Sequence, residues 1–244
     1  MVNGLYTASR GMSNILAKQD INSQNLSNAN TNGFKLARLT NSAEVVLGRN
    51  DEGKLSQREY QTISEQVTSF TQGPLIRTGN NFDLALNGKG FFAVEAPDGI
   101  RYTRNGGFTM NALGELVTLS GKRVMDDNGM PVDMKGNTAQ FMDDGSIFID
   151  GKKAATLSVV NFDDTKKLRY GEDGLFQNTD PEGNPAKVSD ERGVRQGFLE
   201  GSNVDSIATM VSLMGEFRNY EADQKALKAI DDTLGKAVNE VGKV

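Results

Sequence analysis

The spacing of hydrophobic residues divides the chain into two terminal segments and a long middle region. In the N-terminal segment, one helical face steps by three or four residues and becomes more polar toward its end. Its members are Leu5, Ala8, Met12, Ile15, Gln19, Asn22 and Leu26. An Asn-rich run closed by Gly33 follows, and both residue types favour the left-handed conformation at which helices end. The pattern therefore predicts an N-terminal helix that ends near Gly33.

The C-terminal segment carries the longer helical pattern, a hydrophobic seam sustained over about four heptads. Its positions are Met210, Leu213, Phe217, Tyr220, Gln224, Leu227, Asp231, Leu234, Val238 and Val241. Polar seam residues lower stability but specify register and partner, and Asn203 or Asp205 is suited to cap the start of the helix. Two interpretations stay open, a helix that lies on the chain's own core and a helix that pairs with a partner. The length of about 35 residues exceeds the usual 8–20 and favours a partner.

The middle region, residues 37–205, holds 21 of the 27 glycines and all five prolines. Short β-type runs in it are each ended by a turn sequence such as Asp-Gly or Asn-Gly, which supplies the positive φ angles of hairpin turns. The runs are 91–94, 122–125, 146–149, 155–162 and the residues before the turn 171–174. Regular turns with few helical stretches predict an antiparallel β domain.

The three regions together predict an α+β protein. We expect the N- and C-terminal helices to pair as a coiled-coil-like helical domain, with a central and mainly antiparallel β domain. The predicted boundaries are 1–36 for the N-terminal helix, 37–73 for a connector that is partly extended or partly mobile, 74–200 for the β domain and 201–244 for the C-terminal helix.

Composition narrows the possible functions. With 37% hydrophobic residues the chain can bury a core. The net charge of −5 and the absence of a basic run argue against nucleic acid as a partner. The absence of Cys and His excludes disulfides, thiolate chemistry and Cys/His zinc sites. Residues 1–24 contain no continuous apolar run, so we expect no cleaved signal peptide. No stretch of the chain approaches 18 apolar residues, so we expect no membrane span.

Candidate catalytic and metal-binding chemistry is weak throughout. The acidic turns at 126–129 and 143–145 suggest a calcium loop, but an EF-hand starting at Asp126 would require Glu at its twelfth position, where the chain has Asn137. Hairpin turns explain these residues better. An enzyme without His or Cys would need a Ser–Lys or paired-carboxylate site, and no pattern selects such a pair. No catalytic residue, metal or cofactor is therefore predicted.

Four segments in order carry a family resemblance: QNLSNANTNGFK at 24–35, QGPLIRTGNNFDLALNGKGFF at 72–92, YTRNGGF with GELV at 102–108 and 114–117, and LEGSNV at 199–204. The first resembles the signature of the flagellar basal-body rod and hook family, roughly N-N-L-A-N-x-N-T-x-G-[FY]-K. Gln24 in place of Asn and Ser27 in place of Ala are mild departures. The other segments resemble, in turn, the entry to the family's β domain, its continuation, and the lead into the C-terminal helix.

This resemblance implies a structural subunit of the bacterial flagellar rod. Such subunits leave the cell through the flagellar type III export apparatus without a cleaved signal, and they polymerise through their terminal helices into the drive-shaft and export channel below the hook. The implied location is the basal body in the periplasmic space. The implied partners are copies of the chain, other rod and hook subunits, the export apparatus, and the peptidoglycan and ring proteins around the rod. Length and the C-terminal run resemble the proximal-rod type more than the distal-rod type.

The expected assembly interface combines the helix seams with the Asn-rich turn, whose side chains are expected to bond neighbouring backbone. It comprises Leu5, Met12, Ile15, Asn25, Leu26, Asn28, Met210, Leu213, Phe217, Tyr220, Leu227, Leu234 and Val238. Two alternatives from other classes remain open at this point. One is a secreted binding module with a β domain and a coiled-coil stalk, and the other is an enzyme such as a cell-wall hydrolase.

Overall fold

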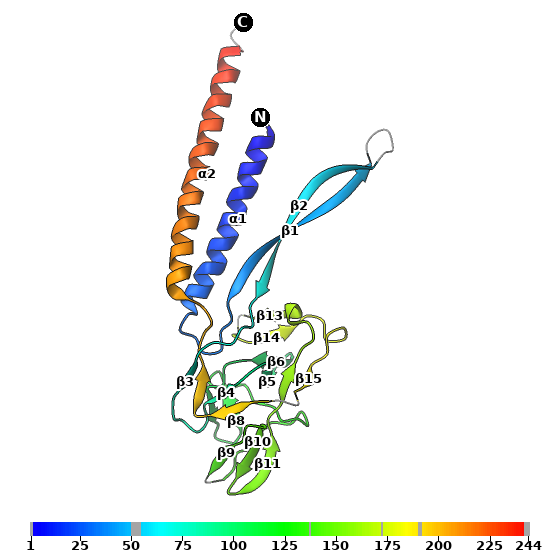
Figure 1. Ribbon diagram of the computed structural model, residues 1–244, viewed down its shortest axis with the longest axis vertical. Helices are drawn as coiled ribbons and strands as arrows, with labels where there is room; N and C mark the ends of the chain where they lie inside the picture. Colours follow the sequence, from blue (N-terminus) through cyan, green and yellow to red (C-terminus); the bar gives the residue numbers. More distant parts are fainter. Residues whose placement is uncertain (1, 50–54, 137, 172, 190–191, 242–244) are drawn as a thin grey trace. The chain divides into compact units, whose positions relative to one another are not determined.

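The computed structural model describes residues 2–49, 55–136, 138–171, 173–189 and 192–241 (Figure 1). For residues 2–8, 41–49, 55–64, 234 and 236–241 it describes the backbone alone. The chain divides into two compact units, each assembled from segments that are distant in sequence. Unit 1 comprises residues 1–27, 37–67 and 205–244, and unit 2 comprises residues 28–36 and 68–204. Each unit is described by itself.

Unit 1 contains both long helices and one long hairpin. The helices α1 (Val2–Ser27) and α2 (Ser206–Val241) lie side by side and run in opposite directions (Figure 1). Strands β1 (Ala37–Arg49) and β2 (Leu55–Thr68) pair only with each other in the described part of the chain, and β1 contacts α1. Most of the range expected as a connector therefore forms a two-stranded hairpin.

Local chemistry determines where the two helices begin and end. At the start of α2, the Asp205 carboxylate accepts a hydrogen bond from the Ala208 amide at 3.0 Å, which is the N-cap expected from the sequence. After α1, the Thr31 amide donates to the Asn28 carbonyl at 3.0 Å and Gly33 has a φ of +72°. This turn ends the helix at Ser27, and residues 28–36 become part of unit 2 rather than of the helix.

Unit 2 is built from short antiparallel strands. The largest sheet has six strands in the order β13-β14-β6-β5-β12-β15. Their bounds are β13 (Leu168–Tyr170), β14 (Phe176–Asn178), β6 (Gly99–Thr103), β5 (Phe91–Ala96), β12 (Val159–Asn161) and β15 (Lys187–Val188), with the short 3-10 helix η1 (Thr165–Lys167) before β13.

Smaller sheets complete unit 2. A three-stranded sheet has the order β11-β10-β9, and three pairs are β16-β4, β17-β3 and β7-β8, all antiparallel. Their bounds are β3 (Leu75–Arg77), β4 (Leu84–Leu86), β7 (Phe108–Met110), β8 (Leu116–Thr118), β9 (Ala139–Phe141), β10 (Ser146–Ile149), β11 (Lys152–Thr156), β16 (Val194–Gln196) and β17 (Phe198–Glu200).

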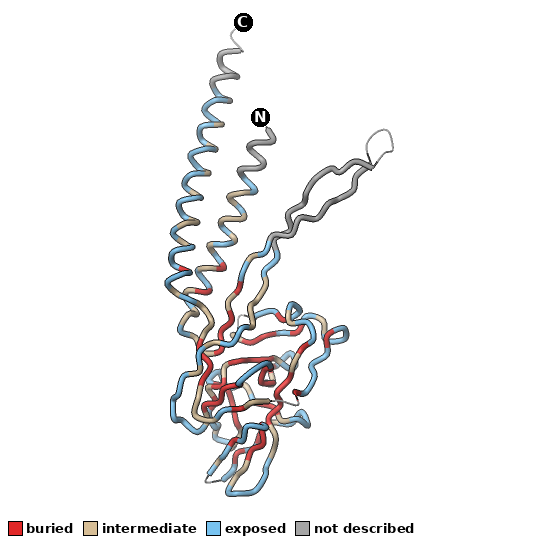
Figure 2. Tube along the Cα trace, viewed as in Figure 1, coloured by how far each residue is buried: buried red, intermediate tan, exposed pale blue. Residues whose placement is uncertain are grey.

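Strand β5 is buried on both faces and separates two hydrophobic cores of unit 2. Alternate side chains of a strand point to opposite faces, so Phe92 and Val94 enter one core while Phe91 and Ala93 enter the other. The first core is aliphatic for the most part, and the second joins Phe91 to Phe176 and Phe162 in edge-type ring contacts. Figure 2 shows buried residues gathered in unit 2, whereas most of α2 is exposed.

The predicted turns and strands are recovered at most positions. Asp150 and Gly151 both have positive φ, 49° and 80°, which is the conformation of a two-residue hairpin turn. The runs 91–94 and 146–149 and the residues before the turn 171–174 coincide with strands, and 155–162 covers the end of β11 and all of β12. The run 122–125 forms only isolated bridges such as Val94 with Val124. Among the described residues, no helix is long and apolar enough to cross a membrane.

Candidate assembly interface

The contact between α1 and α2 within unit 1 uses part of the predicted seams. On α1, Met12, Ile15 and Leu26 are half-buried, as the helical spacing predicts. On α2 the half-buried seam residues are Leu213, Tyr220 and Leu227, which alternate with half-buried Glu216, Asp223 and Ile230. The alternate positions of the predicted seam, Met210, Phe217, Gln224 and Asp231, are exposed instead. The side chains of Leu5, Leu234 and Val238 lie outside the described residues.

A polar contact joins the C-terminal part of α1 to the N-terminal part of α2. The Asn22 side-chain amide donates a hydrogen bond to Glu216 Oε1 at 2.7 Å. Glu216 Oε2 and Gln19 Nε2 are buried, and neither atom has a partner among the described residues. Burial raises the pKa of the Glu216 carboxyl, while the bond from Asn22 and the charge of Lys18 oppose that shift. The seam pattern did not identify Glu216, because it occupies a position between the predicted apolar residues.

The Asn25 side chain joins the end of α1 to the start of β1. It is fully buried, its amide donates to the Ala37 carbonyl at 2.7 Å, and its oxygen accepts from the Ala37 amide at 2.9 Å. This two-point contact is the backbone bonding expected of the Asn-rich turn. Because the side chain is inaccessible, Asn25 cannot contact a neighbouring copy in this conformation. Half-buried Asn28 remains in the interface between copies as a prediction.

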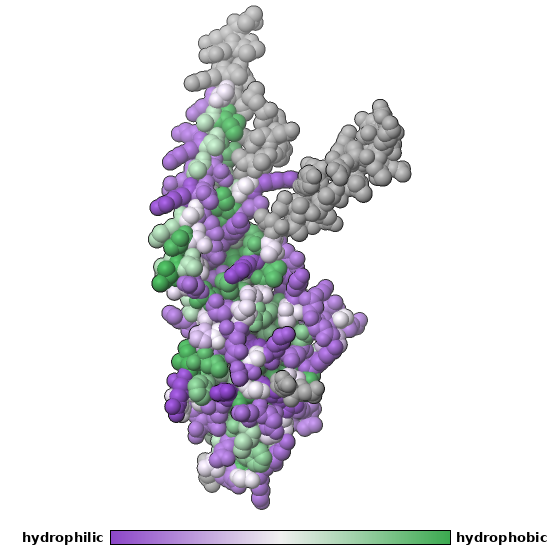
Figure 3. Space-filling model, in the orientation of Figure 1, coloured by the Kyte–Doolittle hydropathy of each residue, from purple (hydrophilic) through white to green (hydrophobic). Residues whose placement is uncertain are grey.

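An apolar stripe covers the first turns of α2. We define the apolar stripe as Ile207, Met210, Val211, Met214 and Phe217, whose spacing of three or four residues puts them on one side of the helix. Their exposed fractions are 75%, 47%, 65%, 61% and 57%. Figure 3 shows the hydrophobic side chains gathered on this part of α2. A continuous exposed stripe of large hydrophobic residues marks an interaction surface.

Unit 2 holds a buried ion triad, whose three residues come from segments that are distant in sequence. We define the ion triad as Lys35, Arg104 and Glu200, whose side chains are nearly inaccessible. Lys35 Nζ contacts Glu200 Oε1, and Arg104 Nη1 lies 3.1 Å from Glu200 Oε2. Burial lowers the pKa of Lys35 and that of Arg104, and the Glu200 carboxylate opposes both shifts. Three charged groups buried together require close pairing.

Backbone groups add hydrogen bonds to the ion triad, in which Arg104 Nε is buried without a partner among the described residues. Lys35 Nζ donates to the Thr71 carbonyl at 2.8 Å, and Arg104 Nη2 donates to the Gly88 carbonyl at 2.7 Å. The Gly73 amide donates to Glu200 Oε1 at 3.0 Å. A Cβ at position 73 would lie 2.1 Å from the Gly201 carbonyl oxygen, so only glycine fits there.

The ion triad brings together all four sequence segments that carry the family resemblance. Lys35 closes the first segment, Arg104 lies in the third and Glu200 lies in the fourth. Gly73 of the second segment donates its amide to Glu200. The Leu36 amide adds a hydrogen bond to Asn203 Oδ1 at 2.7 Å. Sequence reasoning identified the segments but not these three charges as a group, since nothing in the spacing pairs residues 165 positions apart.

Comparison with known proteins agrees with this architecture. Residues 5–35 match the family described as flagella basal body rod protein, and residues 195–240 match flagellar basal body rod FlgEFG protein C-terminal. Residues 85–149 match the flagellar hook protein FlgE/F/G D1 domain. The first two matched ranges include much of α1 and α2, and the third lies in unit 2.

Full-length relatives extend this match. The chain is 33% identical over 246 residues to the flagellar basal-body rod protein FlgF of Caulobacter vibrioides, with 100% of both chains covered. It is 31% identical over 245 residues to the FlgF protein of Rhizobium meliloti, with 99% of both covered. It is also 31% identical over 249 residues to the flagellar basal-body rod protein FlgG of Agrobacterium fabrum, which covers 93% of this chain and 95% of the relative.

Proposed function

Since the chain belongs to the flagellar basal-body rod protein family, we propose that it builds the rod through its helices, with the apolar stripe of α2 as the contact between copies. The chain is a structural subunit of the rod rather than an enzyme, as its relatives are. The observation that carries the proposed contact is the exposure of five large hydrophobic residues on α2 beside a face that already contacts α1.

Burial of the apolar stripe supplies a sufficient driving force for assembly. Fully burying a large aliphatic or aromatic side chain contributes about 1.5–3 kcal/mol. The five side chains are about half-exposed or more, so a neighbouring copy that covers them gains a substantial part of that amount at each position. Contacts of this kind between unlike surfaces of identical copies generate open helical polymers.

The helix pair itself supports the contact between copies. Leu213, Tyr220 and Leu227 hold α2 against α1 in a coiled-coil-like pairing, and this presents the apolar stripe outward. Met12, Ile15, Leu26 and Asn28 remain partly accessible and belong to the proposed interface. Leu5, Leu234 and Val238 continue both seams in the sequence and belong to it too.

The position of the subunit within the rod is the finer part of the proposal. We place it in the proximal rod, because the two FlgF relatives align over 246 and 245 residues, nearly the length of this chain. A distal-rod position is the alternative, supported by FlgG relatives of similar identity. Restoration of motility in a strain that lacks FlgF, and not in one that lacks FlgG, would support the proximal position.

The same proposal names the partners and the route of the subunit. It leaves the cell through the flagellar type III export apparatus and joins the basal body in the periplasmic space, where other rod and hook subunits, ring proteins and peptidoglycan surround it. The names of the relatives support the basal body as the destination. Blocking the export apparatus is expected to retain the protein inside the cell, as measured by fractionation.

The direct test of the interface changes one exposed residue of the stripe. Phe217→Asp places a charge in the proposed contact, so polymer in negative-stain images of purified protein, and motility on complementation, are expected to be lost. Hydrogen exchange of unit 2 is expected to stay unchanged, because Phe217 is not part of it. Gln224→Asp, which adds the same charge at an exposed position outside the stripe, is the matched control. Motile cells carrying Phe217→Asp would refute the contact.

A further inference from the structure

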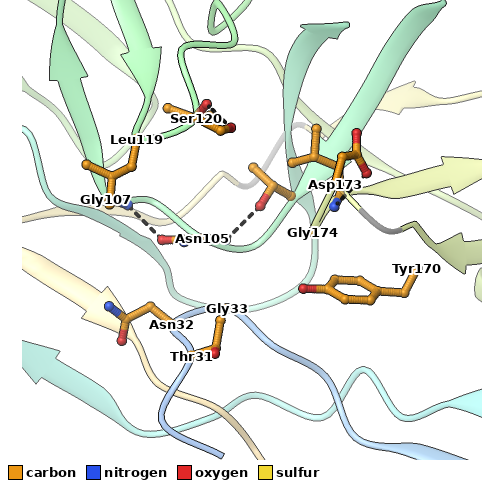
Figure 4. Close-up of a pocket in the computed structure, with 13 residues that line it drawn as sticks. Thr31, Asn32, Gly33, Asn105, Gly107, Leu119, Ser120, Tyr170, Asp173 and Gly174 are labelled. Carbon is orange, nitrogen blue, oxygen red and sulfur yellow. Dashed lines mark hydrogen bonds between the residues drawn. The ribbon is translucent and has the colours of Figure 1, made fainter. Parts of the chain in front are cut away.

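A polar pocket of about 200 Å³ lies entirely within unit 2. Its walls come from four places in the sequence, residues 31–33, 103–107, 118–120, and Tyr170 together with 173–175 (Figure 4). The same segments 24–35 and 102–108 that carry the family resemblance supply two of these walls. None of the pocket residues belongs to the helices or to the apolar stripe.

Close backbone packing keeps the floor of the pocket free of side chains. Gly33 has a φ of +72°, and a Cβ there would lie 2.2 Å from the Asn105 amide nitrogen. Gly174 has a φ of +76°, and its Cβ would lie 3.5 Å from the Tyr170 hydroxyl. Any other residue at position 33 would be strained and would collide with the backbone. The open floor is therefore a consequence of the fold rather than of loose packing.

Several polar groups of the pocket are already engaged and rigid. Asn105 Oδ1 accepts from the Gly107 amide at 3.0 Å, and the Thr118 and Ser120 hydroxyls are 3.0 Å apart. Asp173 accepts from the Leu175 amide at 3.2 Å and forms an ion pair with Lys122 at 3.4 Å. These contacts hold the pocket walls in place.

Other polar groups in the pocket remain available. Figure 4 shows the Tyr170 hydroxyl directed toward the space beside Asn105 and Gly33. Asn105 bonds through its backbone amide and Oδ1, and within the described part of the chain its Nδ2, the Tyr170 hydroxyl and the Asn32 side-chain amide make no hydrogen bond. An edge contact with Phe34 and a tilted contact with Phe176 hold the Tyr170 ring. The pocket thus offers hydrogen-bonding groups that are not used within the described fold.

The charge of the pocket restricts its ligand. Asp173 is the only ionisable acid among the lining residues, it is paired with Lys122, and no basic side chain lines the pocket. An anion such as phosphate would lack a counter-charge there. A metal ion would lack ligands, since the described residues contain no group of three or more suitable side chains. The remaining class is a neutral ligand rich in hydroxyl or amide groups.

We propose that this pocket binds one ring of a saccharide. Hydroxyls and side-chain amides match the donors and acceptors of a sugar. The Leu119 side chain, which lines the pocket and is 79% exposed, offers apolar surface for the C–H face of the sugar ring. Because a cavity of about 150 Å³ accommodates a benzene ring, the pocket has room for a single sugar ring.

The test uses the full-length protein and two soluble trisaccharides. Chitotriose and cellotriose are titrated separately while backbone amide shifts are recorded by NMR on the Phe217→Asp protein, which is expected not to polymerise. If Phe217→Asp still assembles, the apolar-stripe proposal fails while saturation-transfer difference spectra still report sugar binding. Saturable shifts confined to the four pocket walls are expected for at least one sugar.

Two variants and one control decide whether the pocket is responsible. Tyr170→Phe and Asn32→Ala each remove a group that makes no hydrogen bond in the described fold, and each is expected to weaken binding about five- to ten-fold. Tyr102→Phe removes a hydroxyl from a buried core position outside the pocket and is expected to leave the affinity unchanged. Cosedimentation of the protein with insoluble peptidoglycan then tests whether the pocket also binds the glycan of the cell wall and not only a soluble sugar.

Three outcomes would overturn the saccharide proposal. The first is no saturable shift with either sugar. The second is equal affinity of wild type, Tyr170→Phe and Asn32→Ala. The third is a shift of the same pocket residues with protein concentration in the absence of sugar, which would assign the pocket to a neighbouring copy.

Discussion

Units 1 and 2 bury their hydrophobic residues to very different degrees. Unit 2 encloses two cores in which Phe92, Leu84 and Leu157 are fully inaccessible. On α2 of unit 1, the most deeply seated hydrophobic seam residues are only half-buried, and the apolar stripe faces outward. A segment with few buried contacts has low local stability. From this comparison we predict that unit 2 is stable by itself and that unit 1 gains stability from neighbouring copies.

Each unit holds buried polar atoms without a hydrogen-bond partner among the described residues. In unit 2 these are Arg104 Nε and Glu95 Oε2, and the second of them forms an ion pair with Arg123 at 2.7 Å. In unit 1 they are Glu216 Oε2 and Gln19 Nε2 of the helix pair. An unsatisfied buried polar group costs about 1–3 kcal/mol, which lowers the stability of the helix pair. The units therefore differ in the burial of hydrophobic residues rather than in unsatisfied polar groups.

The largest expected effect comes from removing the carboxylate of the ion triad. Glu200→Gln leaves Lys35 and Arg104 buried without a counter-charge, so unit 2 is expected to lose about 3–5 kcal/mol of unfolding free energy. Urea unfolding followed by far-UV circular dichroism measures this loss, because the chain has no Trp to report by fluorescence. Glu182→Gln, at an exposed position, is the matched control and should change little. Equal midpoints for both variants would contradict the importance of the triad.

The same Phe-to-Ala substitution, made once in each unit, tests the difference in burial directly. Phe92→Ala removes a fully buried ring and is expected to destabilise unit 2 by about 3–5 kcal/mol. Phe217→Ala removes a ring that is 57% exposed, and in the monomer it is expected to cost no more than about 0.5 kcal/mol. Hydrogen exchange by mass spectrometry resolves the two units separately. Strong destabilisation of dilute monomer by Phe217→Ala would show that α2 already covers this residue within one chain.

The smallest effect concerns the pH dependence of the helix pair. The pKa of Glu216 is raised by burial above its ordinary value of 4.5, so folding favours the protonated carboxyl. The stabilising contribution of Glu216 to folding is complete below pH 4.5 and is lost as the pH rises through the raised pKa of the folded state. The helices of the monomer should therefore gain stability on mild acidification, measured as the helical circular dichroism signal in thermal scans. Glu216→Gln should remove this dependence, and an unchanged dependence would assign it to other groups.

Sequence periodicity was most informative where local chemistry acts alone. The steps of three and four residues predicted both helices, and Asp205 was recognisable as a cap because its own side chain bonds the first turn. Asp150-Gly151 was recognisable as a turn because its φ angles depend on those two residues. The hairpin β1–β2 was not predicted, since a polar and irregular pattern gives no clear alternation.

The amino-acid sequence by itself determined the family, the terminal helices, the turn positions and the β character of the middle region, because each depends on neighbouring residues. Only the tertiary structure decided that Lys35, Arg104 and Glu200 meet, since their pairing requires the chain to return over long separations. It also decided which side of α2 is covered. Heptad spacing marks a broad apolar sector of the helix, and only packing against α1 leaves Phe217 outside the contact while Leu213 lies within it.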